Sequence, residues 1–160
     1  MLTKVIEQSK IDHFTKWFDR ADKIVIVSHV GPDGDAIGSS LGLWHFFSSQ
    51  GKTANVIVPN AFPDFLKWMP GSKDVLLYDR YKEFADKLIA EADVICCLDF
   101  NAIHRIDAMG DAVLAYPGKK NTDRPSSPSG GFLQDYHFPS GDIFHFGTGF
   151  PPDLPYGLFQ

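Results

Sequence analysis

Two kinds of segment follow one another along the first 120 residues, and they differ in how their apolar and polar positions are arranged. Short runs rich in apolar residues occur at 23–28, 53–58 and 93–98, with a shorter one at 75–78, and each predicts a strand. The continuous apolar character of the first run indicates burial on both faces, as in a parallel sheet. The segments around them place apolar residues at helical spacing, at 11–22, 36–50 and 81–92, with a shorter helical turn at 103–109. Strands that alternate with helices predict an α/β fold with a doubly wound parallel sheet.

This pattern breaks near residue 120. Residues 121–160 contain no Ala, Val, Lys or Glu, yet they hold six of the eleven prolines, and their phenylalanines follow no period. The sequence therefore predicts an α/β domain over 1–120 and a tail over 121–160 that forms no regular elements. One interpretation of the tail is a Pro/Gly-rich extended arm. The other is a segment translated out of frame, because local and global signals here disagree.

Back-translation favours the second interpretation. Permitted codons for residues 120–127, read one base later, encode Lys-Ile-Leu-Ile-Asp-His-His, and the same offset continues into a long amphipathic segment. This alternative frame supplies a strand, a ligand-bearing loop and a helix, which the predicted domain requires. We therefore hypothesise one extra base in the A-rich codons around 119–120. The DNA sequence across codons 117–130 tests this hypothesis directly.

Composition narrows the function classes. A net charge of -5 argues against a protein that binds long duplex nucleic acid, which needs a basic face. It does not exclude a small phosphorylated substrate, because bound cations supply positive charge locally. No apolar run approaches a membrane span, the first ten residues do not form a secretory signal, and the adjacent Cys96 and Cys97 lie inside an apolar run. We therefore expect a cytoplasmic protein with no membrane partner.

Candidate ligands follow two of the predicted strands. His29, Asp33 and Asp35 come after the first, and Asp99 directly follows the third. Because the carboxyl ends of parallel strands meet at one edge of a sheet, we expect these side chains to converge. Imidazole and carboxylate groups in this arrangement indicate a divalent metal site. The alternative is a hydrogen-bonded turn in which Asp33 or Asp35 caps the next helix, and Asp99 is another N-cap candidate.

Other residues near these ligands give weaker indications of a functional role. Ser39 falls in the first turn of the helix predicted at 36–50, where backbone N–H groups can hold a phosphate; the alternative is an ordinary helix start. Arg105 follows Asp99 closely enough to reach a phosphate; the alternative is an exposed helical residue. We interpret one aromatic-rich group as core or an interface patch, not as a base-stacking platform: Phe62, Phe65, Trp68 and Met69.

Two segments resemble the signatures of a known family. Residues 28–39 look like the first signature of the DHH phosphoesterases, and Asp99 within 94–100 looks like the second. The resemblance covers about 10–120 and is closest to the bacterial bifunctional oligoribonuclease and 3'-phosphoadenosine 5'-phosphate phosphatase type (DHH/DHHA1). Members of that branch have an α/β catalytic domain with a two-metal site, usually Mn²⁺, and a separate C-terminal substrate domain.

The resemblance implies roles for individual residues. His29 and Asp33 would bind one metal, Asp35 the other, and Asp99 would bridge both, with Mn²⁺ expected and Mg²⁺ as the alternative. The implied catalytic residues are Asp33, Asp35 and Asp99. The implied substrate is short single-stranded RNA or a nucleotide 3'-phosphate such as pAp, with Ser39 and Arg105 as candidate contacts.

The chain departs from the family's pattern in three respects. The Asp-His-His motif, a later metal-binding Asp and the C-terminal DHHA1 domain are all missing from the sequence as written. We therefore expect an incomplete catalytic domain and a truncated, impaired phosphoesterase. The alternative function is a non-catalytic α/β module that binds a metal or a nucleotide. The sequence makes no prediction of the oligomeric state.

Overall fold

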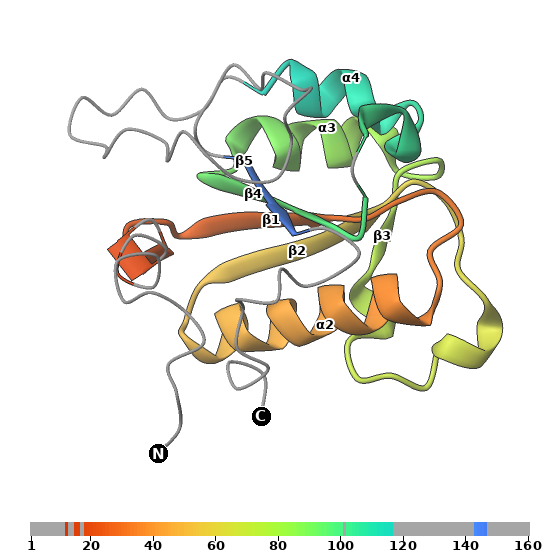
Figure 1. Cartoon of the computed structure of the whole chain (residues 1–160), viewed down its shortest axis with the longest axis horizontal. Helices are drawn as coiled ribbons and strands as arrows, with labels where there is room; N and C mark the ends of the chain where they lie inside the picture. The colour runs from red at the N-terminus through yellow and green to blue at the C-terminus, as the bar shows by residue number, and fades with distance from the viewer. Residues whose placement is uncertain (1–11, 13–14, 17, 101, 117–142, 147–160) are drawn as a thin grey trace.

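A single parallel sheet of five strands organises the protein (Figure 1). The computed structural model describes residues 12, 15–16, 18–100, 102–116 and 143–146, the last four by their backbone. The strand order is β3-β2-β1-β4-β5, and all neighbours pair in parallel. The strands are β1 Lys23–Val27, β2 Thr53–Val58, β3 Leu76–Leu77, β4 Val94–Leu98 and β5 Ile143–Phe146.

Helices cover both faces of this sheet, which confirms the doubly wound α/β fold. Helix α2 lies on one face, and α3 and α4 lie on the other (Figure 1). The helices are α2 Gly34–Ser49, α3 Lys82–Glu91 and α4 Met109–Leu114, with 3₁₀ turns η1 Asp64–Leu66, η2 Ser72–Asp74 and η3 Ile103–Ile106. The helix predicted at 11–22 is helical at 12, 15–16 and 18–19, and its other apolar positions, Phe14 and Trp17, lie outside the described residues.

Strand β1 shows why an unbroken apolar run forms a central strand. Successive strand side chains point to opposite faces, so Ile24 and Ile26 enter the apolar layer beneath α2. Val25 and Val27 enter the layer beneath α3 and α4. All four are buried, and β4 is buried at every position. Strands β1 and β4 thus lie between the two apolar layers, and both end at the same edge.

Strand β5 corrects the prediction that 121–160 forms no regular element. Residues 143–146 pair in parallel with β4, with Ile143 opposite Ile95 and Phe146 opposite Leu98. The outer edge of β4 presents unpaired backbone groups, and Ile-Phe-His-Phe has high β-propensity. Backbone pairing at an edge needs no side-chain period, so periodicity missed it. The rest of the predicted tail lies outside the described residues.

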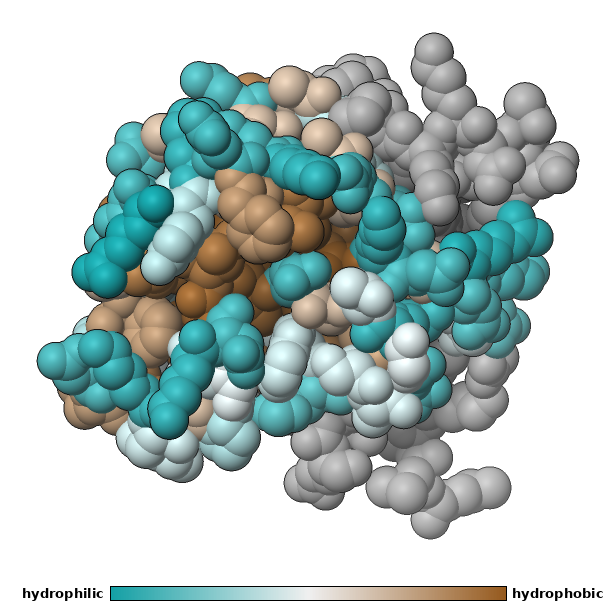
Figure 2. All heavy atoms as spheres, turned by 180° about the vertical axis from the view of Figure 1, so that it is seen from behind, coloured by the Kyte–Doolittle hydropathy of each residue, from teal (hydrophilic) through white to brown (hydrophobic). Residues whose placement is uncertain are grey.

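The opposite edge of the sheet is partly open. Strand β3 pairs only with Ile57 and Val58, the last two residues of β2. Apolar side chains are visible in a hollow on the reverse face of the molecule, bordered by hydrophilic ones (Figure 2). Nearer the start of β2, the Trp44 indole N–H donates to the Ala54 carbonyl at 2.9 Å. A side chain thus supplies a hydrogen bond that β3 is too short to make.

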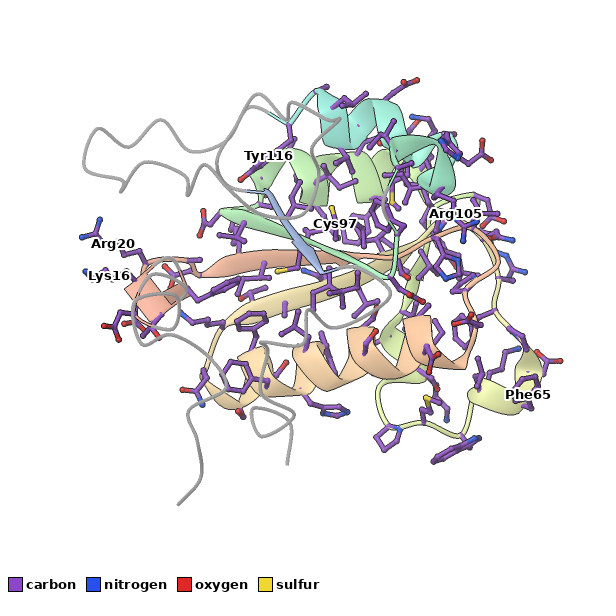
Figure 3. The ribbon with its side chains drawn as sticks, viewed as in Figure 1. Lys16, Arg20, Phe65, Cys97, Arg105 and Tyr116 are labelled. Atoms are coloured by element: carbon purple, nitrogen blue, oxygen red, sulfur yellow. The ribbon has the colours of Figure 1, made fainter. Side chains whose placement is uncertain are left out.

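The aromatic-rich segment after β2 is divided between core and surface. Phe62 is buried, as predicted, and Met69 packs against the core beneath α2. Phe65 and Trp68 are 72% and 76% exposed, so neither is a core residue. Phe65 projects from the outside of the molecule (Figure 3). For these two residues only the interface prediction remains, and it is untested.

Gly71, in the segment after β2, packs closely against Trp44 of α2. Replacement of Gly71 by Ala is expected to destabilise the fold. A Cβ there would lie 2.6 Å from a ring carbon of Trp44, at a φ of +87°. Gly51 is a matched control, because its φ is +75° but a Cβ meets nothing within 4 Å. Left-handed backbone costs each variant about 1–2 kcal/mol, and overpacking adds about 1–3 kcal/mol for Gly71→Ala alone. Equal free energies of unfolding for the two variants in urea would contradict the packing argument.

Candidate metal centre

The candidate ligands meet at the carboxyl edge of the sheet, between β1 and β4. The chain leaves β1 through α2 toward β2 on one side and later enters β4 on the other. In open α/β sheets this reversal of strand order creates a crevice beyond the strand ends, where ligands bind. His29 follows β1, Asp99 directly follows β4, and Asp33 is the N-cap of α2. The predicted convergence therefore has a topological cause.

Three long-range hydrogen bonds fix the loop between β1 and α2. The Ser28 hydroxyl donates to Leu98 O at 3.1 Å and joins the ends of β1 and β4. The Val30 N–H donates to Arg105 O at 2.7 Å. The Gly31 N–H donates to Asn60 Oδ1 at 2.7 Å, with Gly31 at a φ of 61° that favours glycine. Segments after β1, β2 and β4 are thus tied together around His29.

His29 is buried, and both of its ring nitrogens have a defined neighbour. Nδ1 lies 2.8 Å from the Val30 carbonyl, which can only accept a hydrogen bond. In the neutral ring this contact places the proton on Nδ1 and leaves the lone pair on Nε2. Nε2 faces Asp99 Oδ2 at 3.3 Å. A metal-binding histidine typically donates its other N–H to a carbonyl in this way.

Asp33 combines the capping and ligand roles that the sequence left as alternatives. Its Oδ1 accepts the Ala36 N–H at 3.0 Å, which caps α2. Its backbone carbonyl accepts the Ile37 N–H at 3.0 Å. A carboxylate has two oxygens, so Oδ2 is available to a cation. The Asp33 carboxylate therefore lies at the positive end of the α2 dipole.

Asp99 occupies an uncommon backbone conformation at the end of β4. Its φ is 63°, in the left-handed region that Asp tolerates better than most residues. Burial is the main cause that raises the pKa of Asp99, and the charges of Asp33 and Asp35 raise it further. A protonated His29 ring, which donates from Nε2, lowers it. Without a cation, the ionised carboxylate is therefore disfavoured at this position.

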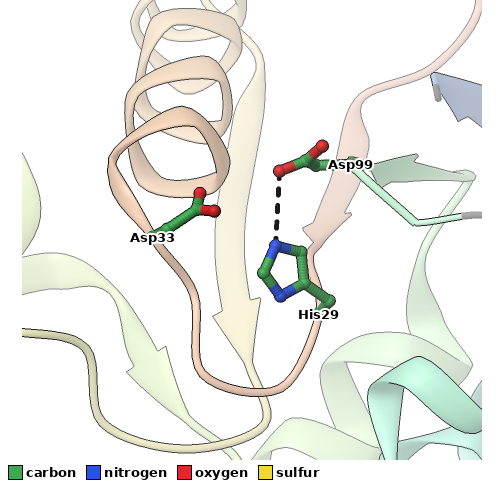
Figure 4. A group of neighbouring side chains, drawn as sticks. All are labelled: His29, Asp33 and Asp99. Carbon is green, nitrogen blue, oxygen red and sulfur yellow. Dashed lines mark hydrogen bonds and ion pairs between the residues drawn. The ribbon is translucent and has the colours of Figure 1, made fainter. Parts of the chain in front are cut away.

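His29, Asp33 and Asp99 form a group suited to one divalent cation (Figure 4). One ligand atom from each lies within 4.8 Å of the other two. Bonds of about 2.1 Å in octahedral geometry place neighbouring ligand atoms about 3 Å apart, close to the separation of Nε2 and Oδ2. With the proton on Nδ1, these two atoms are both acceptors, and a shared cation removes their repulsion. One nitrogen and two oxygen ligands suit Mn²⁺ or Mg²⁺ better than a thiolate-seeking metal.

Asp35 and Ser39 do not join this group. Asp35 is exposed in the first turn of α2 and lies outside the three-residue cluster. The placement of Ser39 in the first turn is wrong, because the Asp33 cap starts α2 at Gly34, two residues earlier than predicted. The Ser39 hydroxyl donates to Asp35 O at 2.7 Å. A phosphate at this helix start would meet the N–H groups of Gly34 and Asp35.

Arg105 is exposed in η3, beyond the ends of the strands (Figure 3). Its backbone carbonyl accepts the hydrogen bond from the Val30 N–H. Within the described part of the chain, its guanidinium makes no hydrogen bond or ion pair. Sequence reasoning missed Asn60, which anchors Gly31. An Asn at the end of a predicted strand is a common turn residue, so no local signal marked it.

Comparisons with known proteins identify the family of this chain. Residues 23–117 match the model of the DHH family, N-terminal domain. A bifunctional oligoribonuclease and PAP phosphatase of Thermus thermophilus is 45% identical over 51 residues, which are 32% of this chain and 15% of that protein.

A crystal structure of an exopolyphosphatase-related protein from Bacteroides fragilis is 81% identical, with a TM-score of 0.70. The match covers 74% of this chain and 35% of that one, so the chain spans about a third of this relative. No helix among the described residues is long and apolar enough to cross a membrane. The family match covers more than half of the sequence, and the chain belongs to the DHH family.

Proposed function

We propose that this chain carries the first metal site of a phosphoesterase that acts on short oligoribonucleotides or nucleotide 3'-phosphates. The observation that carries the proposal is the cluster of His29, Asp33 and Asp99 at the switch point of the sheet. Membership of a phosphoesterase family and the name of the Thermus thermophilus relative support the substrate class. Mn²⁺ is the proposed metal, with Mg²⁺ as the alternative.

The residues of the cluster would prepare the site before a substrate arrives. The Val30 carbonyl fixes the His29 ring with Nε2 facing Asp99. The α2 cap holds Asp33, which orients its second oxygen. Two divalent cations in such a site would neutralise phosphoryl charge and activate a water for in-line attack. Asp35, close enough to raise the pKa of Asp99, is the proposed ligand of the second cation, and Asp99 the proposed bridge.

Arg105 is the proposed contact to the scissile phosphate. A guanidinium binds phosphate oxygens in a bidentate fork, and Arg105 has no competing partner in the described chain. The hydroxyl of Ser39 is directed to the helix backbone, so a role for Ser39 requires that hydroxyl to turn toward substrate. We therefore rank Arg105 above Ser39.

We also propose that this chain is impaired. A second cation held only by Asp35 and Asp99 would bind weakly, and the sequence as written contains no Asp-His-His. The alternative function, a non-catalytic α/β module that binds a metal or nucleotide, shares the first cation site but not hydrolysis.

Calorimetry with Mn²⁺ tests the proposed function. Asp33→Asn keeps an oxygen that can cap α2 but removes the ligand charge, so we expect Mn²⁺ binding to weaken by about 10-fold or more with the fold intact. Asp111→Asn is the matched control, because it removes the same charge from the first turn of another helix, α4, outside the cluster. No Mn²⁺ binding by the unmodified chain would contradict the metal site.

Phosphodiesterase turnover in the same samples separates the two functions. Binding with weak residual hydrolysis that requires Asp33 supports an impaired enzyme. Binding without any hydrolysis, even at high Mn²⁺, supports the non-catalytic module.

A further inference from the structure

The arginines at the carboxyl edge differ from the lysine beside them. Arg80 and Lys82 follow β3, and Arg105 follows β4. The Lys82 ammonium is paired with Asp86 at 2.7 Å and lies over the Tyr78 ring. Within the described chain, the side chains of Arg80 and Arg105 make no hydrogen bond or ion pair, and both residues are exposed. On a chain with a net charge of -5, two arginines near an acidic cluster thus keep their guanidinium groups available.

Backbone hydrogen bonds place Arg80 beside the end of β2. The Tyr78 N–H donates to Val58 O at 2.9 Å, and the Asp79 N–H donates to Pro59 O at 3.1 Å. Both bonds extend the pairing of β2 with β3 past the strand ends. The next residues along the two segments are Asn60 and Arg80. The Arg80 N–H then donates to Leu77 O at 3.2 Å, which turns the chain toward α3.

Asn60 lies between Arg80 and the metal cluster. Its Oδ1 accepts the Gly31 N–H, two residues from both His29 and Asp33. Its amide NH₂ donates no hydrogen bond within the described part of the protein. Along this edge the metal cluster therefore lies at β1 and β4, Asn60 lies at the end of β2, and Arg80 lies after β3. Neighbouring strands are about 4.8 Å apart, so Arg80 is about two strand spacings from the end of β1.

We propose that Arg80, assisted by the amide of Asn60, binds a second phosphate group of the substrate on the β3 side of the metal centre. A guanidinium offers only donors, and the Asn60 NH₂ is a donor whose neighbouring Oδ1 already accepts from Gly31, which suits a phosphate and not a cation. The ligand class is a nucleotide that bears two phosphates, or an oligonucleotide whose next phosphate lies one unit from the scissile one. This inference rests on the proposed function, because the cluster must hold the first phosphate through its cations.

Binding of adenosine 3',5'-bisphosphate and of the two adenosine monophosphates, measured by calorimetry with Mn²⁺, tests this proposal. We expect the unmodified chain to prefer the bisphosphate by about tenfold or more, the contribution of one charged hydrogen-bonded contact. Arg80→Ala should abolish the preference, and Arg80→Lys should restore part of it. Arg20→Ala is the control, because it removes an equal charge from the opposite end of the molecule (Figure 3).

The possible failures are distinguishable. Equal affinity for the bisphosphate and the monophosphates, no binding of any of them, or an equal loss in Arg20→Ala would overturn the Arg80 site. Titration with Mn²⁺ alone must give the same affinity for the unmodified chain and Arg80→Ala. If the unmodified chain binds no Mn²⁺, the proposed function fails. If Mn²⁺ binds normally and the preference for two phosphates is missing, only the Arg80 site fails.

Discussion

Replacement of Asp99 by Asn is expected to weaken Mn²⁺ binding by about 100-fold or more and to raise the melting temperature of the metal-free protein. Loss of a direct ligand should cost at least as much affinity as loss of the groups that orient ligands, which is about 10–100-fold. Asn tolerates the positive φ of this position, so the backbone is preserved. The Asn amide can also donate to Nε2 of His29, which the ionised Asp99 cannot.

The effect on stability follows from the pKa of Asp99. Burial raises that pKa in the folded chain, so the folded state binds the proton more tightly than the unfolded state. The contribution of Asp99 is then most favourable below its unfolded pKa and is lost as pH rises through the folded pKa. Asn avoids this loss. The gain in melting temperature should therefore be largest at neutral pH and should shrink toward pH ~4, the ordinary pKa of Asp.

Thermal unfolding with and without Mn²⁺ measures both effects together. The metal should stabilise the unmodified chain and leave Asp99→Asn unchanged, because a ligand stabilises only the state that binds it. Asp107→Asn is the control at a second aspartate with positive φ, which lies outside the cluster. A lower melting temperature of metal-free Asp99→Asn at neutral pH would contradict the electrostatic account.

The second large effect concerns turnover. The 160-residue chain is expected to hydrolyse short RNA and nucleotide 3'-phosphates about 10³-fold or more slowly than the product of the same gene after deletion of one base near codons 119–120. In the hypothesised frame, the residues after 120 supply the Asp-His-His ligands that the resemblance assigns to the family. Without them, we expect a second cation to have too few ligands in this chain.

Steady-state rates of the two purified products with Mn²⁺ measure this difference. Asp33→Asn in the product of the one-base deletion should remove its activity, which would show that hydrolysis uses the cluster. Robust Mn²⁺-dependent turnover by the chain as written would contradict the impairment. An encoding DNA without an A-run around codons 119–120 would contradict the frame hypothesis itself.

The sequence predicted the centre of the fold because burial there has a simple pattern. Strand β2 has the predicted bounds, and β1 and β4 each differ by one residue, since both faces of these strands must be apolar. Helix α2 ends at Ser49, one residue before the predicted end, and Gly51 follows its C-cap at a φ of 75°. The site also follows from this pattern, because parallel strands that share an edge must bring His29 and Asp99 together.

The remaining features depend on contacts between distant segments. Pairing of β5 with β4 needs only an open edge, which periodicity does not record. The exact start of α2 depends on the Asp33 cap. Because α2 begins two residues earlier than predicted, Ser39 lies beyond its first turn. The links from Val30 to Arg105 and from Gly31 to Asn60 span many residues and carry no local signal. The role of Asp35 stays a prediction, because it belongs to a second cation site that the three-residue cluster does not include.

A crystal structure of the chain soaked with Mn²⁺, phased with manganese anomalous scattering, tests the central claim most directly. The account predicts an anomalous peak bonded at about 2.1–2.2 Å to Nε2 of His29, to an oxygen of Asp33 and to an oxygen of Asp99. A second, weaker peak beside Asp35 is expected only at high Mn²⁺. An empty cluster, or a strong peak elsewhere on the molecule, would contradict the account.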